Sequence, residues 1–241
     1  MNLCLVVDTS ITGASLALVQ AENLENVIWS HIHPDKHGSS SGLASRLSLG
    51  LKESGHQPSD IRQMIISQGP GSFTGIKAGL AFTRGFSSGL KHPPLWMGLS
   101  SLEAGGHLLR QKSLKRDETL WFFLPSTKTH GYLAICSEHE VCSFLVDINS
   151  MQAGDTDLLL PSEKTHIIFA SPWASMEEKY KDHHQVRTLT DNQVLLSTCL
   201  NGMIQVAIER GATGFSPKIP EPRYLRKSTV EERMDMIKEK K

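Results

Sequence analysis

The sequence predicts an α/β fold with two lobes, in which mixed sheets are flanked by helices. Three observations predict it. Short apolar strands, a glycine-rich turn and amphipathic helices alternate over the first hundred residues. A second group of strands follows and ends in a long helix. The chain has 241 residues, a length that suits one large domain or two small ones of roughly 100 residues each.

The first segment is predicted to be a hairpin followed by a third strand. Residues 3–7 form a short continuous apolar run, which suits a central strand buried on both faces. Turn-forming residues extend from Asp8 to Gly13, and residues 15–19 return as a second strand. Residues 27–32 are expected to add the third.

A helix is predicted over residues 43–53, because leucines recur every four residues on one face and Gly55 follows as a stop signal. Residues 60–67 are predicted to form a strand that runs directly into a glycine-rich turn. A helix begins at that turn and continues to about residue 90. A break at residues 91–94 and a strand over 95–99 close the first half.

The second half is expected to be an antiparallel meander followed by one more strand and a long helix. The strands are predicted at residues 120–124, 132–136, 141–146 and 167–169. The helix is predicted over about residues 192–210, with Thr190 and Gln193 as a capping box and Gly211 just past its end. No clear internal repeat is visible.

Composition bounds the function. Lys plus Arg and Asp plus Glu both number 25, so the formal net charge is zero. A protein that grips nucleic acid by itself usually has a basic excess that neutralises phosphates. If RNA is the substrate, another protein is therefore expected to hold it. Four scattered cysteines indicate buried thiols, and no apolar run approaches the roughly 20 residues needed to span a bilayer. A cytoplasmic protein without a membrane segment is expected.

The glycine-rich turn is the first candidate site. Three glycines in seven residues let the backbone turn tightly and present N–H groups at a helix N-terminus, where an anion can bind. Asp8 ends the first strand and could orient a water or Mg²⁺ beside phosphates. The alternatives are a plain strand-to-helix turn and an Asx turn. The phosphate-loop-like residues are Asp8, Thr9, Gly69, Gly71, Ser72 and Gly75.

The helix after this turn is the second candidate, because small residues four positions apart allow another backbone to approach closely. It packs either against the protein's own sheet or against a partner, with the leucine face of the preceding helix as the other half of the contact. The predicted partner interface is Leu43, Leu47, Leu51, Gly75, Ala78, Gly79, Phe82 and Phe86.

No metal or catalytic site is predicted within the chain. Eleven histidines include a group at His31, His33 and His37, but no metal-binding motif accompanies them. No nucleophile elbow is expected, and Ser, His and Asp are too abundant for their presence to indicate a triad.

Together these pieces resemble the TsaB (YeaZ) family. Residues 7–18 are similar to the first phosphate hairpin of actin-like ATPases and sugar kinases. Residues 68–80 (QGPGSFTGIKAGL) are similar to the most distinctive TsaB motif. Residues 98–104 (GLSSLEA) and 222–226 (PRYLR) fit two further family segments. The middle of the chain, roughly 105–215, matches weakly.

The resemblance implies a two-lobed actin-like (ribonuclease-H-like) fold and a non-catalytic subunit. Its expected partner is TsaD, which transfers a threonylcarbamoyl group to adenosine next to the anticodon in tRNA. TsaE is expected to join the complex, and TsaC to supply threonylcarbamoyl-adenylate. The tRNA is expected to be contacted indirectly. No cofactor is expected on this chain; ATP or ADP and the metal are expected on the partner subunits.

The same resemblance assigns no catalytic residues here. The catalytic relative carries two metal-binding histidines at positions that match Ser101 and Gly105, and His107 is out of register. Residues 169–175, where a second phosphate loop is expected, contain no glycine. In residues 125–132 the family usually has an Asp-Ala-Arg and an acidic residue before a tyrosine. Of these residues, only the tyrosine, Tyr132, is present here.

The predicted organisation is an N-terminal actin-like lobe over residues 1–104, a divergent C-terminal lobe over 105–215, and a tail over 216–241 with a short amphipathic helix from Ser228. The alternative functions are a stand-alone actin-like ATPase or a metallopeptidase-like enzyme. A homodimer through the same small-residue helix is a third hypothesis.

Overall fold

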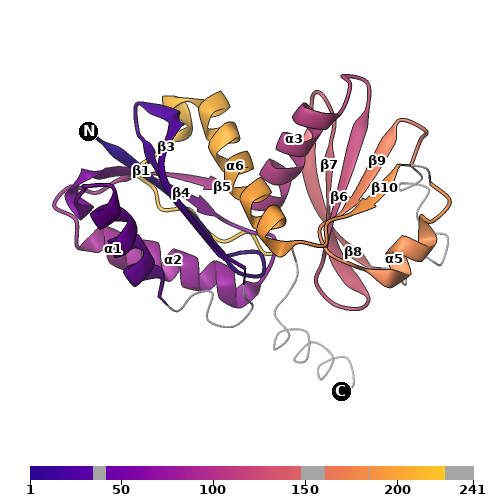
Figure 1. Ribbon diagram of the computed structural model, residues 1–241, viewed down its shortest axis with the longest axis horizontal. Helices are drawn as coiled ribbons and strands as arrows, with labels where there is room; N and C mark the ends of the chain where they lie inside the picture. Colours follow the sequence, from indigo (N-terminus) through magenta and orange to yellow (C-terminus); the bar gives the residue numbers. More distant parts are fainter. Residues whose placement is uncertain (35–41, 148–160, 184, 226–241) are drawn as a thin grey trace, which may run out of the picture.

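The computed structural model describes residues 1–34, 42–147, 161–183 and 185–225. Two five-stranded sheets lie side by side, with two long helices between them (Figure 1). The first lobe contains β1 (Leu3–Asp8), β2 (Ala14–Gln20), β3 (Asn23–His33), α1 (Leu43–Glu53), η1 (Pro58–Asp60), β4 (Ile61–Ser67), α2 (Phe73–Ser88) and β5 (Leu95–Leu99). The helix α3 (Ser101–Ser113) follows. The remaining elements are β6 (Thr119–Pro125), β7 (His130–Cys136), β8 (Val141–Asp147), β9 (Thr165–Phe169), α5 (Ala174–Lys179), β10 (Val186–Thr188), α6 (Asn192–Arg210) and η3 (Ala212–Gly214).

The two sheets have the same topology. The first has the order β3-β2-β1-β4-β5 and the second the corresponding order β8-β7-β6-β9-β10. In each, three strands form an antiparallel meander and two further strands add in parallel to the central one. This is a ribonuclease-H-like strand order used twice. The predicted two-lobed actin-like α/β fold is confirmed, and the structure also reveals an internal repeat that the sequence does not.

Alternation along β1 explains how the first lobe is layered. Leu3, Leu5 and Val7 face α1 and α2, whereas Cys4 and Val6 face α6 on the other side of the sheet. All six residues of β1 are buried, as the continuous apolar run predicts for a central strand. Figure 1 shows α1 and α2 together on one face of this sheet.

Trp29 on β3 closes the core beneath α1. Its indole Nε1 donates to the Glu53 carboxylate over 2.9 Å, and its ring lies against Gly50. A Cβ at Gly50 would lie 2.6 Å from that ring, so a glycine is required there for α1 to approach the sheet.

The second lobe follows the same pattern with more aromatic residues. Phe122 on β6 faces α3 and α6, whereas Trp121 and Phe123 face α5. Phe123 stacks on Phe169 of β9 with ring centroids 5.2 Å apart. Burial raises the pKa of Tyr180, just after α5, to about 12, so its phenol stays neutral within this cluster.

The two interlobe helices cross over. Helix α3 follows the first sheet but packs against β6 and β7, and α6 follows the second sheet but packs against β2 and β3. The helices meet through glycines: a Cβ at Gly105 would lie 2.8 Å from the sulfur of Cys199, and one at Gly202 would lie 2.3 Å from the carbonyl oxygen of Ala104. The domain boundary predicted between residues 104 and 105 falls inside α3.

Most predicted elements are present, and α1 has the predicted bounds. The prediction misses the helices α3 and α5, the strand β10 and the two short 3-10 helices η1 and η3. The cap of α6 is also different, because the N-cap is Asp191, whose side chain accepts from the N–H of Gln193, rather than Thr190. The predicted tail helix from Ser228, like His37, lies outside the described residues.

Candidate functional site

The turn after β1 is a buried polar cluster. Asp8 Oδ1 accepts hydrogen bonds from the N–H of Ser10 over 2.8 Å and from its hydroxyl over 2.7 Å. The Ser10 hydroxyl lies 2.7 Å from that of Ser101, at the start of α3, and accepts from the hydroxyl of Ser67, at the end of β4. Asp8, Ser10 and Ser101 are each 0% exposed. The cluster therefore ties the first turn to β4 and α3 without reaching solvent.

The charged form of Asp8 is disfavoured in this position. Burial raises its pKa, and the hydrogen bonds from Ser10 offset this only in part. Its second oxygen, Oδ2, is buried with no hydrogen-bond partner among the described residues. An unpaired buried charge costs free energy, so the native state favours the protonated acid over a wider pH range than the unfolded chain does.

Replacing Asp8 by asparagine is therefore expected to stabilise the fold at neutral pH. Between the unfolded and the raised native pKa, the native state binds more protons, so the free energy of unfolding of the wild type falls as pH rises. Asp8→Asn lacks this fall and should gain roughly 1–3 kcal/mol over the wild type at pH 7 and less at pH 4. Urea unfolding at both pH values measures the difference; an equal difference at both contradicts the assignment.

Two glycines of the 69–75 turn, Gly71 and Gly75, face the backbone of the β1–β2 turn. A Cβ at Gly75 would lie 2.0 Å from the carbonyl oxygen of Thr9, and one at Gly71 would lie 2.0 Å from that of Ser10. Gly71 also has a φ of 154°, and Gly69 has one of 99°, backbone angles that residues with a side chain rarely adopt. Thr9 donates its hydroxyl to the carbonyl oxygen of Gly75 over 2.7 Å. Close approach of two backbone segments thus accounts for these glycines.

Backbone donors of the same turn are already used by the protein. The N–H of Ser72 donates to the carbonyl oxygen of Ser10 over 2.6 Å, that of Gly69 to the hydroxyl of Ser67 over 3.2 Å, and that of Gly75 to the side chain of Ser72 over 3.1 Å. Asp8, Thr9, Gly69, Gly71, Ser72 and Gly75 do come together, as the sequence predicts. In this arrangement these hydrogen bonds join them to one another or to the neighbouring Ser10 and Ser67, and phosphate binding stays a prediction.

The second lobe places different residues at the corresponding turns. Its strand-to-helix turn, residues 170–173, matches 68–72 in topology but contains no glycine, and α5 has six residues where α2 has sixteen. Its first hairpin turn begins after Pro125, with no carboxylate at the position of Asp8. Between the lobes, Ile11 is 3% exposed within an apolar cluster that includes Phe122 and Leu196. The hairpin tip thus packs into an apolar seam between the lobes.

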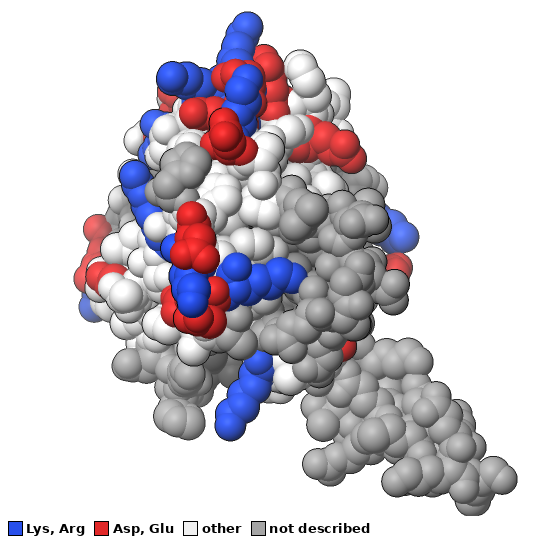
Figure 2. Space-filling view, turned by 90° about the vertical axis from the view of Figure 1, so that its right-hand side faces the viewer, with Lys and Arg blue, Asp and Glu red and all other residues white. Residues whose placement is uncertain are grey.

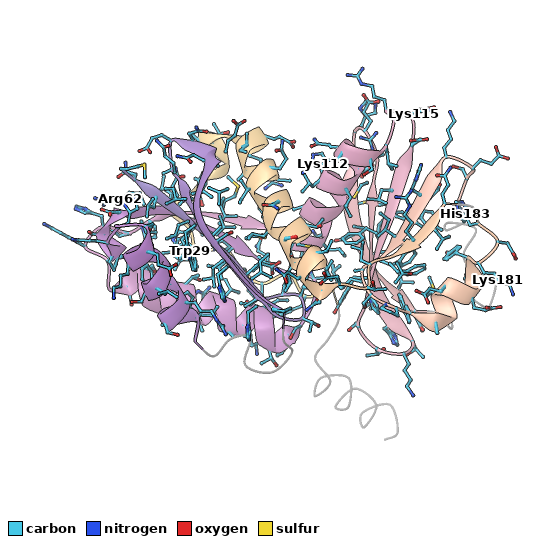
Figure 3. All side chains as sticks on the ribbon, viewed as in Figure 1. Trp29, Arg62, Lys112, Lys115, Lys181 and His183 are labelled. Atoms are coloured by element: carbon cyan, nitrogen blue, oxygen red, sulfur yellow. The ribbon has the colours of Figure 1, made fainter. Side chains whose placement is uncertain are left out.

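The two positions that carry histidines in the catalytic relative have no space for a histidine side chain here. Ser101 lies in the buried hydroxyl cluster, and Gly105 lies against Cys199 of α6 with no room for a side chain. These residues do not fit a metal site. His107 lies nearby but its Nε2 is 3.0 Å from the carboxylate of Glu209 at the α3–α6 contact. His183 lies far from these positions, at the outer end of the second lobe (Figure 3). No cluster of metal ligands occurs within the described ranges.

A Gly-x-Ser-x-Gly pattern does occur in the chain, at residues 85–89, but it is not a nucleophile elbow. An elbow places its serine on a sharp turn between a strand and a helix. Here the pattern lies at the C-terminal end of α2, and the hydroxyl of Ser87 donates to the carbonyl oxygen of Arg84 in the same helix over 2.9 Å. The pattern therefore supplies no candidate catalytic serine.

The predicted partner surface needs a correction. Leu43, Leu47 and Leu51 are 1–4% exposed and pack into the core of their own lobe. Gly79, like Gly75, is buried against Thr9. Phe82 and Phe86 are half-buried against the same core, and Ala78 is half-buried. The leucine face of α1 covers the sheet beneath it, so Leu43, Leu47 and Leu51 are not available to a partner. Ala78, Phe82 and Phe86 keep part of their surface exposed, and their contact with a partner stays a prediction.

A different face of the same two helices is exposed. On α2, Ala81 and Gly85 are exposed, and a Cβ at Gly85 would meet no atom within 4 Å. On α1, Ala44 and Ser48 are exposed, and Leu49 is 50% exposed. A glycine within a helix costs roughly 1 kcal/mol relative to alanine, and nothing in the described chain requires one at position 85. The small-residue pattern of α2 therefore has an outward-facing half.

A contact missed by the sequence prediction joins three segments near the glycine turn. The N–H of Arg223 donates to the carbonyl oxygen of Gln68 over 2.8 Å, and its guanidinium donates to Glu103 over 2.6 Å. Glu103 also accepts from the hydroxyl of Ser143 on β8. The available signal was that Gln68, Glu103 and Arg223 all lie in segments that resemble one family.

The charged side chains of the described residues are mixed in sign. On the face of the second lobe shown in Figure 2, basic and acidic groups lie among one another. Several are paired, such as Lys164 with Asp117 over 2.6 Å. No helix in the described part of the chain is long and apolar enough to cross a bilayer.

Comparison with known proteins gives two kinds of similarity. Residues 40–117, which span α1 to α3 and the turn before β6, match the model of the family TsaD: tRNA N6-adenosine threonylcarbamoyltransferase. A structure of an uncharacterized Pseudomonas aeruginosa protein similar to peptidase YeaZ has a TM-score of 0.64 at 17% identity, covering 94% of this chain and 100% of that chain. YeaZ from Pseudomonas aeruginosa has a TM-score of 0.61 at 17% identity, covering 88% and 94%. A search of curated protein sequences finds no match.

Proposed function

We propose that this chain is a TsaB-like, non-catalytic subunit that pairs with a TsaD-type protein and supports transfer of a threonylcarbamoyl group to adenosine next to the anticodon in tRNA. The observation that carries the proposal is the combination of a YeaZ-like fold over almost the whole chain with a TsaD-family segment over residues 40–117. That segment contains both helices of the exposed face described above.

The buried first turn supports the non-catalytic role. An actin-like ATPase needs an accessible carboxylate and phosphate-binding N–H groups in both lobes. Here Asp8 is 0% exposed, three N–H groups of the glycine turn are used internally, and the second lobe has no glycine turn at the corresponding position. Positions 101 and 105 have no space for metal-binding histidines, which disfavours the metallopeptidase-like alternative as well.

The exposed face of α1 and α2 is the proposed contact with TsaD. We call it the outer helix face and define it as Ala44, Ser48, Leu49, Ala81 and Gly85. It combines an exposed leucine with small residues that let a facing helix come close. A homodimer through the same face is compatible with this function if the two partners exchange. TsaE is expected in the assembled complex, and the neutral net charge fits a tRNA that is held mainly by the other subunits.

The test is binding of the purified chain to its cognate TsaD, measured by size-exclusion chromatography and calorimetry. Ala81→Arg places a long charged side chain on the outer helix face and is expected to weaken binding at least about 100-fold, because a charge would be desolvated in a close helix contact. Ala174→Arg, at an exposed alanine of α5, is the matched control and should bind normally.

Three results would contradict the proposal. Wild-type chain that never associates with TsaD overturns the function itself. Normal binding by Ala81→Arg means that the contact lies elsewhere on the molecule. ATP hydrolysis by the chain alone, at a rate that a mutation of Asp8 abolishes, favours the ATPase alternative.

A further inference from the structure

Residues 216–225 run across the first lobe after η3. At one end, Ser216 pairs with Trp96 of the edge strand β5 through two backbone hydrogen bonds of 2.7 and 2.9 Å. Near the other end, the side chain of Gln68 donates to the carbonyl oxygen of Glu221 over 2.6 Å, and the N–H of Arg223 donates back to Gln68. We call these ten residues the clasp.

The clasp reaches both lobes. Ile219 packs against the core between the first sheet and its helices, and Leu225 packs against the apolar cluster at the seam between the lobes. Arg223 donates to Oε1 of Glu103 over 2.6 Å, and Ser143 of β8 donates to the same oxygen over 2.5 Å. A single carboxylate on the first turn of α3 thus joins the clasp to the edge strand of the second sheet.

The clasp also touches the first turn of α2. The ring of Tyr224 lies 4.8 Å from that of Phe73, the first residue of the helix, and the Lys77 ammonium lies 4.0 Å from the Phe73 ring centre. Phe73 lies two residues before Gly75, which is packed on Thr9. Position and order at the start of α2 therefore depend on contacts from the clasp as well as from the β1–β2 turn.

The clasp buries little of its own surface but fits closely against the surface beneath it. None of its ten residues is buried, and three of them are prolines, which cannot donate backbone hydrogen bonds. The fit is close at Gly98 of β5, where a Cβ would lie 2.7 Å from the Cβ of Pro220. Few buried contacts on a closely fitting surface are the properties of a segment that opens locally at low free energy.

We propose that residues 216–225 are a detachable clasp: docked on Glu103, it orders the first turn of α2, the helix that carries Ala81 and Gly85 of the outer helix face, and its release loosens that helix. Glu103 is the positioning residue of this device, since it holds the clasp through Arg223. The effect on partner binding rests on the proposed function, whereas the effect on order at the start of α2 does not.

The test uses the full chain carrying Glu103→Gln, Arg223→Gln or both. In the Glu103→Gln variant, the side-chain amide oxygen can still accept from Ser143, but the ion pair with Arg223 is lost. We expect each single change to speed hydrogen exchange of residues 68–77 by about fivefold to tenfold, and to weaken binding to TsaD by a similar factor. The double variant should do no more than either single one, because both remove the same ion pair.

Arg116→Gln is the matched control. Arg116 forms a 3.3 Å ion pair with Glu138 at a site where its side chain is 91% exposed, and its loss should leave residues 68–77 unchanged. If hydrogen exchange at residues 68–77 is unaltered in both single variants, the clasp does not order the start of α2. If the effects of the two changes add in the double variant, the Arg223–Glu103 contact is not what holds the clasp in place. If wild-type chain fails to bind TsaD, the proposed function fails, and the exchange measurement still decides the clasp.

Discussion

Gly75→Ala is expected to destabilise the protein by about 3 kcal/mol or more, although alanine is the best helix former. The added methyl would lie 2.0 Å from the carbonyl oxygen of Thr9, and a backbone atom cannot rotate away as a side chain can. Relief requires α2 to move off the β1–β2 turn, which breaks the hydrogen bond from Thr9 to Gly75 and disturbs Ser10. The free energy of unfolding in urea measures the effect.

Gly85→Ala is the matched control, since it makes the same change in the same helix at a site where the methyl meets no atom within 4 Å. It should stabilise the isolated chain by roughly 0.5–1 kcal/mol, because alanine loses less backbone entropy than glycine in a helix. Equal effects of the two substitutions, in either direction, would contradict the packing explanation of the glycine motif.

Leu47→Glu is expected to unfold the chain. Leu47 is 1% exposed in the core beneath α1, so the substitution removes a large apolar contact and buries a carboxylate there. The cost should exceed about 4 kcal/mol, a large part of the roughly 5–15 kcal/mol that stabilises a typical protein. Circular dichroism and the urea midpoint would report the loss.

Leu49→Glu, two residues further along α1, provides the contrast. Leu49 is 50% exposed on the outer helix face, so the substitution should change the free energy of unfolding by no more than about 0.5 kcal/mol. It should nevertheless weaken binding to TsaD. A folded Leu47→Glu protein, or a Leu49→Glu protein that unfolds, would mean that α1 presents the opposite face to the sheet.

The contrast between Leu47 and Leu49 on α1 shows what could be predicted from the sequence and what could not. Periodicity placed α1 correctly and identified its apolar face, because a helix that covers a sheet needs one. It could not tell whether that face met the protein's own sheet or another molecule. Both uses favour leucine every four residues, and only the tertiary structure shows Leu43, Leu47 and Leu51 in the core.

The glycine turn shows the same limit at the candidate site. Closely spaced glycines predict close approach to something, and the sequence could not say whether this was a phosphate or a backbone. The structure places Thr9 and Ser10 against Gly71 and Gly75, a contact between segments far apart along the chain. The missed helix α3 has a related cause. Gly105 and Gly106 lower its helix propensity, and the structure needs them because Cys199 of α6 and Cys136 of β7 pack closely against them.

The crossing of α3 and α6 has a consequence for how the molecule holds together. Each half of the polypeptide supplies the helix that completes the other half's sandwich, an exchange like domain swapping carried out within one chain. Residues 1–100 or 114–241 expressed alone would leave an apolar sheet surface open to water and should aggregate. Thermal unfolding of the whole chain should accordingly be a single cooperative event, with both halves melting together.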